Sequence, residues 1–260
     1  MRILIVNDDG IHAKGIKALT EKLAKKHEVT VVAPDSERSA SSHSITINRP
    51  LRVSKAAPAG LEGISCYKVD GLPVDCTKIG ITHVMQSGVD LVVSGINHGA
   101  NMGSDVLYSG TVSAALDAVI MGYRAMAVSI ASFYPNHLET AAQLALDIID
   151  GGVIDSQPDG VLYNLNVPDL PLNEIKGVKV TRQGRTIYED AVDVRHDPRG
   201  NEYIWMAGEL IKSSGSDDTD VCAVHTGYAS LTPLKYDLTD NGQIQSLNCM
   251  IGKLKFHFSE

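Results

Sequence analysis

The chain has 260 residues, of which 43% are apolar and 5% aromatic, and it carries a formal net charge of −8. This length suits one large α/β domain whose core is filled by Val, Ile, Leu and Ala. The acidic balance disfavours the broad basic face that nucleic-acid polymers require. No apolar run approaches the roughly 20 residues of a membrane span, and Met1-Arg2 leads directly into a strand. We therefore expect a cytoplasmic protein that has neither nucleic-acid polymers nor membranes as partners.

Strands and helices alternate through residues 1–168. Apolar runs predict strands at 3–6, 29–33, 45–53, 64–69, 90–94, 125–130 and 161–165. Helical spacing of apolar residues predicts helices at 16–26, 75–85, 111–121 and 138–149. This alternation is typical of an α/β fold with a doubly wound, mostly parallel sheet.

The pattern changes after Pro168. Strands are expected at 178–182, 186–194 and 203–207, with a polar turn at 196–200, which together predict a protruding β-hairpin. A short helix at 217–226, a short strand at 229–231 and a helical or extended tail at 243–258 follow. We expect residues 1–168 to form the catalytic core. Residues 169–260 would complete the same domain and supply oligomer contacts, although a plain surface hairpin fits the pattern nearly as well.

Two adjacent carboxylates, Asp8 and Asp9, follow the first strand directly and are followed by Gly10. In an open α/β sheet, the ligand site lies beyond the carboxyl ends of the strands. Adjacent negative charges repel each other and would repel an anion, so a bound divalent cation is the simplest remedy. The alternative is a capped turn without a ligand.

Two further loops after predicted strands carry oxygen-bearing side chains. Residues 35–44 contain five serines, and residues 94–101 contain Asn97 and Asn101 among glycines. Carboxylate, hydroxyl and amide oxygens suit Mg²⁺, Mn²⁺ or Ca²⁺ better than zinc or copper. Because all three loops should meet at one edge of the sheet, we expect one divalent cation per subunit.

Ser109-Gly110-Thr111 stands at the start of the helix predicted from residue 111. Free N–H groups and the helix dipole favour an anion there, although Ser109 is also a common N-cap residue. A cation on one side and a helix N-terminus on the other would clamp a phosphoryl group. The P-loop, GxGxxG and GxSxG motifs are absent from the sequence.

Several separate motifs occur along nearly the whole chain. They are Asn7-Asp8-Asp9-Gly10, Arg38-Ser39, the loop 94–101, the stretch 104–112, Asn164-Leu165-Asn166-Val167-Pro168, Thr219-Asp220, Gly227-Tyr228 and Thr232-Pro233-Leu234. In this order they resemble the stationary-phase survival protein SurE family. The resemblance implies a Rossmann-like fold with an extended hairpin and C-terminal extension, and a homodimer or homotetramer. It also implies metal-dependent hydrolysis of nucleoside 5′- and 3′-monophosphates and, in some members, of polyphosphate.

The resemblance also assigns roles to individual residues. The metal ligands would be Asp8, Asp9, Ser39 and Asn97, and the phosphate would be held by Asn101, Ser109, Gly110 and Thr111. The chain departs from the family pattern at Lys14, Ser113 and Asp117, none of which is a proposed ligand.

Some roles remain open in the sequence. Either Asp8 or Asp9 could act as the catalytic base for a water molecule. Asn7, His43 and Tyr108 are candidates for supporting roles around the site: Asn7 in ordering the loop, His43 in reaching the leaving-group oxygen, and Tyr108 in lining a nucleoside pocket. A non-catalytic, metal-dependent nucleotide sensor and a nucleotide-sugar-dependent transferase are the alternatives to a phosphomonoesterase.

Overall fold

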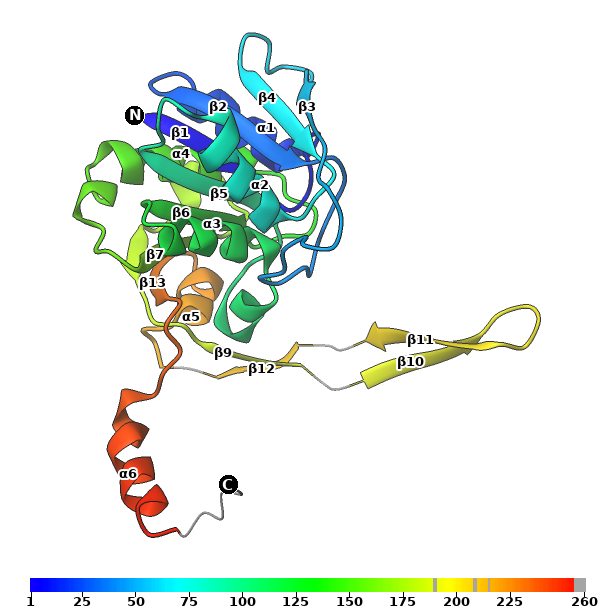
Figure 1. The fold of residues 1–260 in the computed structure, drawn as a ribbon, viewed down its shortest axis with the longest axis vertical. Helices are drawn as coiled ribbons and strands as arrows, with labels where there is room; N and C mark the ends of the chain where they lie inside the picture. The colour runs from blue at the N-terminus through cyan, green and yellow to red at the C-terminus, as the bar shows by residue number, and fades with distance from the viewer. Residues whose placement is uncertain (189–190, 208–209, 215, 255–260) are drawn as a thin grey trace, which may run out of the picture.

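One mixed sheet organises the molecule (Figure 1). The computed structural model describes residues 1–188, 191–207, 210–214 and 216–254. Within this part of the chain, nine strands pair in the order β3-β4-β2-β1-β5-β6-β7-β13-β8. Their bounds are β1 Arg2–Val6, β2 Glu28–Pro34, β3 Val53–Ala56, β4 Ser65–Val69, β5 Leu91–His98, β6 Ala125–Ile130, β7 Val161–Val167, β8 Val178–Val180 and β13 Ala229–Lys235.

The order of the strands indicates where in the sheet a ligand would bind. The strands from β4 to β7 are all parallel, and the chain runs from β1 outward to β2 and β4 before it returns to β5 on the other side of β1. The carboxyl ends of β1 and β5 therefore form the point where the strand order reverses, which is where open α/β sheets bind ligands. The predicted doubly wound, mostly parallel fold is confirmed.

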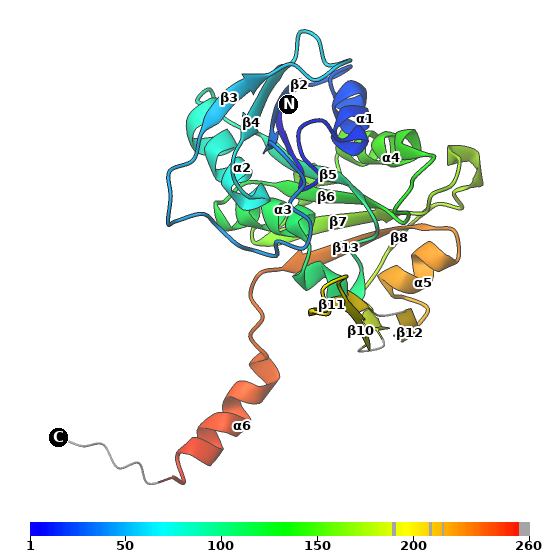
Figure 2. The same cartoon turned by 90° about the vertical axis from the view of Figure 1, so that its right-hand side faces the viewer.

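Helices cover both faces of the sheet (Figure 2). They are α1 Lys14–Leu23, α2 Pro73–Ile79, α3 Gly110–Ile120, α4 Leu138–Asp150, α5 Asp220–His225 and α6 Asn241–Ile251. Ile3 and Ile5 of β1 pack into one apolar cluster with α1 and α4, and Leu4 and Val6 pack into another with α2 and α3. This division follows from the alternation of side chains along a strand. A π-helical turn at Gly80–Val84 continues α2, and 3-10 turns lie at Gly103–Leu107, Ile154–Ser156 and Leu172–Glu174. No helix in the described ranges is long and apolar enough to cross a membrane.

The prediction of a strand at 45–53 is wrong, because only its last residue, Val53, lies in a strand. Residues 45–52 follow an irregular path, and β3 begins only at Val53. Ile47 is 85% exposed, so the alternating apolar pattern here buries no face, and Pro50 offers no N–H for a ladder.

β5 and β13 each extend four residues beyond their predicted ends. β5 continues through Gly95 to His98 with a bulge, and so carries Asn97 on the strand itself. β13 continues through Pro233 to Lys235. β8 pairs with β13 only at residues 229–231, so Pro233 has an open edge on that side, where its missing N–H is tolerated.

The predicted hairpin consists of two antiparallel ribbons. β9 (Arg185–Tyr188) pairs with β12 (Leu210–Ser214), and β10 (Ala191–His196) pairs with β11 (Glu202–Ala207), which projects from the body in Figure 1. The strand expected at 186–194 is thus two strands, and positions 189–190 between them lie outside the described residues. The tail is helical in α6, which stands away from the sheet in both views, and positions 255–258 of its predicted range also lie outside the described residues.

Candidate active site

Asp8 is held in a fixed orientation by the start of α3. It is buried, and the backbone N–H of Thr111 donates to its Oδ2 over 3.1 Å while the Thr111 hydroxyl donates to its Oδ1. A Cβ added at Gly110 would lie 2.9 Å from Asp8 Oδ2 and 2.8 Å from Ser41 Oγ. Glycine therefore stands at residue 110 because the carboxylate lies directly against the backbone. Burial raises the pKa of Asp8, although the Thr111 hydroxyl opposes this effect.

Asp9 has a buried oxygen without a partner. Its Oδ2 accepts no hydrogen bond within the described part of the chain. Burial, and next the charge of Asp8, raise the pKa of Asp9 to about 7, while the backbone N–H of His98 stabilises the ionised form. An unpaired buried carboxylate oxygen is costly, so this position favours a bound cation or a proton.

The serine-rich loop contributes Ser39 and an additional carboxylate. The loop is fastened to the site because the backbone N–H of Arg38 donates to the carbonyl oxygen of Asp8 over 2.7 Å. Ser39 is exposed, and its hydroxyl donates to Glu37 Oε1 over 2.7 Å. With its proton committed to Glu37, the Ser39 oxygen keeps lone pairs for another ligand.

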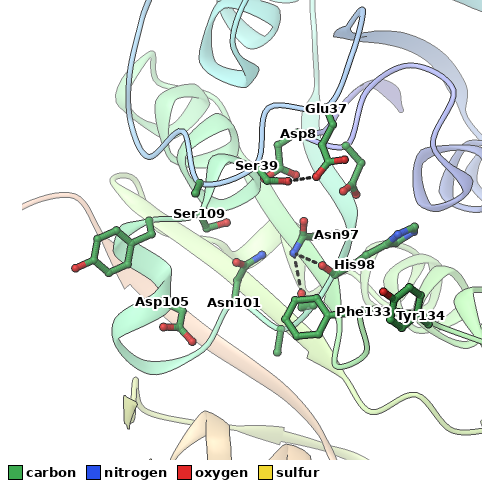
Figure 3. A pocket seen from close by; sticks show the side chains of 15 residues that line it. Asp8, Glu37, Ser39, Asn97, His98, Asn101, Asp105, Ser109, Phe133 and Tyr134 are labelled. Carbon is green, nitrogen blue, oxygen red and sulfur yellow. Dashed lines mark hydrogen bonds between the residues drawn. The ribbon is translucent and has the colours of Figure 1, made fainter. Parts of the chain in front are cut away.

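Asn97 lies at the end of β5, opposite the aspartates. Its Nδ2 donates to the carbonyl oxygens of Gly99 over 2.7 Å and His98 over 3.3 Å. Because the amide nitrogen is committed in this way, the amide oxygen is the atom left for a ligand. Figure 3 shows this oxygen turned toward the side of the cavity that carries Asp8, Glu37 and Ser39.

Asn101 forms hydrogen bonds with side chains of β7 and β6. Its backbone N–H donates to Asn166 Oδ1 over 2.8 Å, and its carbonyl oxygen accepts from Nδ2 of Asn164 and Asn166 over 2.8 and 3.1 Å. Its own Nδ2 donates to Ser129 Oγ over 2.8 Å. One N–H of the Asn101 amide therefore remains for a ligand in the cavity.

Ser109 is the N-cap of α3, since its Oγ accepts from the N–H of Val112 over 3.0 Å. Thr111 is fully buried, and its backbone N–H, which was predicted to hold phosphate, donates to Asp8 instead, as does its hydroxyl. Ser109 faces the cavity, but Gly110 and Thr111 do not line it. The geometry thus favours Thr111 as a group that orients Asp8.

These residues surround a cavity of about 810 Å³, which we call the acidic cavity. It is lined by the predicted residues Asp8, Asp9, Ser39, Asn97, Asn101, Tyr108 and Ser109. Glu37, Asp105, Phe133 and Tyr134, which the sequence did not single out, also line it (Figure 3). The volume is in the range of small-molecule sites.

Comparisons with known proteins show which family the chain belongs to. The family model described as "Survival protein SurE" matches residues 3–190. The chain belongs to the SurE family. A "5'-nucleotidase SurE" of Natranaerobius thermophilus is 46% identical over 256 residues, which cover 95% of this chain and 98% of the relative. Another, from Aeromonas hydrophila, is 41% identical over 251 residues, covering 96% and 98%. The crystal structure of the SurE protein from Aquifex aeolicus superposes with a TM-score of 0.84 at 37% identity and covers 96% of this chain and 100% of that one.

Two candidate supporting residues of this SurE-family chain lie outside the cavity. His43 Nε2 is 3.3 Å from Asp117 Oδ1, which lies on α3 beside Lys78, and His43 lines a different cavity. His43 therefore does not line the acidic cavity, and its contact with a leaving group stays a prediction. Asn7 is fully buried and donates to the Gly10 carbonyl over 3.0 Å, so it orders the turn that carries the aspartates.

The donor set of this SurE-family site fits a hard divalent cation. Asp8, the partnerless oxygen of Asp9, the Ser39 hydroxyl and the Asn97 amide oxygen all line one cavity, and all are oxygen donors. Oxygen ligands of this kind suit Mg²⁺, Mn²⁺ and Ca²⁺. Clusters of three or more His, Cys, Asp or Glu side chains that could hold a metal are absent from the described residues, so the amide and hydroxyl oxygens would have to complete the ligand set.

Proposed function

We propose that this chain is a divalent-cation-dependent phosphomonoesterase that hydrolyses nucleoside 5′- and 3′-monophosphates, and also short polyphosphates. The observation that carries the proposal is the buried Oδ2 of Asp9, which has no hydrogen-bond partner among the described residues and lies beside Asp8 where the strand order of the sheet reverses. The printed names of the relatives, which are 5′-nucleotidases, support the substrate class.

Asp8, Asp9, Ser39 and Asn97 would hold one cation, Mg²⁺, Mn²⁺ or Ca²⁺, in each subunit. When bound, such a cation offsets negative charge on the phosphoryl group and lowers the pKa of a water molecule. Asp8 is oriented for this task by Thr111, whose backbone and hydroxyl donors both engage it.

Asn101 and Ser109 would bind the phosphoryl oxygens from the other side of the acidic cavity. Asn101 offers its remaining amide N–H from a backbone that Asn166 clamps at both its N–H and its carbonyl. Ser109 keeps its hydroxyl proton for a ligand, because the Oγ serves the helix only as an acceptor. Tyr108, which is exposed and lines the same cavity, would border the phosphate ester there.

Asp9 is the better base of the two aspartates. Both oxygens of Asp8 already accept hydrogen bonds from Thr111, whereas Oδ2 of Asp9 accepts none from the residues that the structure describes. We therefore assign to Asp9 the proton of the attacking water. His98 does not suit the role of proton donor, because burial, and next Lys14, lower the pKa of its imidazole.

We further propose a homodimer or homotetramer in the cytoplasm that takes nucleotides rather than nucleic-acid polymers or membranes as partners. The β10–β11 ribbon and α6 carry the residues that support this proposal, since Trp205, Met206, Ile244, Leu247 and Ile251 are all exposed. Exposed apolar side chains concentrated on projecting elements are typical of protein contacts.

Phosphate release tests the proposal. The purified chain should release phosphate from nucleoside monophosphates with Mg²⁺ or Mn²⁺, and EDTA should abolish the release. Ca²⁺, Zn²⁺ and short polyphosphates complete the screen. Cation-dependent nucleotide binding without turnover would contradict the proposal and would leave a nucleotide sensor. Release of a nucleoside diphosphate from a nucleotide sugar, with no phosphate from a monoester, would instead indicate a transferase.

A further inference from the structure

A second cavity of about 570 Å³ opens beside the acidic cavity. The two share four lining residues, which are Gly99, Ala100, Asp105 and Phe133. A Cβ added at Gly99 would lie 3.0 Å from Phe133 Cε1, so one edge of the Phe133 ring, which is 79% exposed, lies beside the backbone at the border of the two cavities. We call the second one the apolar cavity, after the residues at its floor.

The floor is a small apolar cluster that is separate from the two main clusters of the core. Met102, Val221 and Val224 form it, with Ala100 and Ala131 packed against them. All five line the apolar cavity. Residues from the loop after β5, from the end of β6 and from α5 thus come together at one place beside the proposed phosphate site.

Asp220 fixes the α5 wall of this cavity. Its side chain is fully buried, and its oxygens accept the backbone N–H of Gly103 over 2.9 Å and of Gly184 over 2.7 Å. The wall is therefore tied to the same loop that carries Asn101. A cavity with fixed walls binds a ligand at a lower entropic cost than one that must be ordered.

The carboxylates at the edge of the apolar cavity already have partners. Asp169 accepts the backbone N–H groups of Asn136 and His137 and lies 3.1 Å from His137 Nδ1. Thr186 donates to Asp105 over 3.3 Å. The apolar cavity thus differs from the acidic one, where an Asp9 oxygen lacks a partner among the described residues. It suits an uncharged group with a large apolar surface.

We propose that the apolar cavity holds the nucleoside of the substrate, with the base between the Phe133 ring and the Met102–Val224 floor. This inference rests on the proposed function. A phosphoryl group at Asn101 and Ser109 would leave the rest of the ester at the shared border, and Figure 3 shows Phe133 on the far side of Asn97 and Asn101 from Asp8 and Ser39. Every nucleobase has a face that stacks on an aromatic ring, which favours this occupant over a lipid or a peptide.

The test compares two esters on two filling variants. Val224→Phe and Ala131→Leu reduce the apolar cavity from different elements, and neither residue lines the acidic cavity. Each should raise the KM for adenosine 5′-monophosphate at least tenfold while kcat/KM for glycerol 3-phosphate stays within twofold. Ile120→Phe, an equivalent change facing another cavity, should alter neither value.

Several outcomes would overturn the inference. An unchanged KM for the nucleotide in either folded variant would do so, and so would equal losses on both esters in a variant whose melting curve matches that of the unmodified chain. If both variants fail to fold, adenosine titrated into the unmodified chain decides: shifted methyl signals of Met102 and Val224 support the inference, and unchanged signals overturn it. Phosphate release from neither ester by the unmodified chain would instead be a failure of the proposed function.

Discussion

At the scale of single residues, the central feature is a pair of adjacent carboxylates with unequal partners, the buried Asp8 and the partly buried Asp9. Asp8 accepts two hydrogen bonds from Thr111, while Asp9 has an oxygen without one in the described structure. Both pKa values are raised by burial. The pair is therefore costly in its ionised form unless a cation compensates the charge.

Thr111→Val should weaken cation binding by about tenfold, because it removes a donor to a charged group, an interaction worth about 1.5–3 kcal/mol. Thr111→Ser keeps the hydroxyl and should bind the cation nearly as well as the unmodified chain. Calorimetric titration with Mn²⁺ measures both affinities. Equal affinities in the two variants would show that the hydroxyl does not orient Asp8.

The pH dependence of stability without a cation follows from Asp9. Its pKa is about 7 in the fold and about 3.9 in an unfolded chain, so the native state binds the additional proton between these values. Stability in EDTA should therefore fall as the pH rises from 5 to 8. Asp9→Asn should remove much of this loss, on the order of 2 kcal/mol, as thermal unfolding at both pH values would measure. Parallel pH profiles for the two chains would contradict this explanation.

At the scale of elements, β7 orders the loop that carries Asn101 through two asparagines on one face of the strand. Asn164 and Asn166 are fully buried, and both donate to the carbonyl oxygen of Asn101. Two polar residues at i and i+2 of a buried strand were a signal available in the sequence, since one such residue on a core strand already requires a partner.

Asn166→Asp should lower kcat/KM for a nucleotide at least tenfold, because it replaces the donor to Asn101 with an acceptor. Loss of the buried hydrogen bond should also lower the free energy of unfolding by about 1–3 kcal/mol. Steady-state kinetics and urea unfolding check the two effects. A variant with reduced stability but unchanged kinetics would assign to Asn166 a role in folding only.

The sequence predicts the positions of strands and helices better than it predicts the hydrogen-bond partners of individual side chains. The apolar runs located β1, β2 and β6 closely, because burial on both faces leaves a continuous apolar signal. They failed at 45–52, where an alternating pattern faces solvent. Ser109-Gly110-Thr111 was correctly placed at a helix start, but no local pattern shows that Asp8, 103 residues away in sequence, takes the donors of Thr111.

At the scale of the whole molecule, α6 and the β10–β11 ribbon lie apart from the sheet (Figures 1 and 2). Ile244, Leu247 and Ile251 of α6 are exposed at helical spacing. In a single copy of the chain these side chains are exposed to water. In the proposed oligomer, a second copy would cover them.

Removal of the chain after Thr239 should therefore lower the oligomeric mass without unfolding the sheet. Sedimentation at micromolar concentration should show the full chain at a multiple of 27.8 kDa and the shortened chain at a smaller one. A full chain that sediments as a monomer would contradict the proposed assembly.

Binding of Mn²⁺ tests the central claim most directly. Titration followed by electron paramagnetic resonance should show one Mn²⁺ per unmodified chain. Asp9→Asn should abolish binding, while Asp105→Asn, which removes another carboxylate of the same cavity, should preserve it. Stoichiometric binding by Asp9→Asn with unchanged affinity, or the absence of binding by the unmodified chain, would contradict the account.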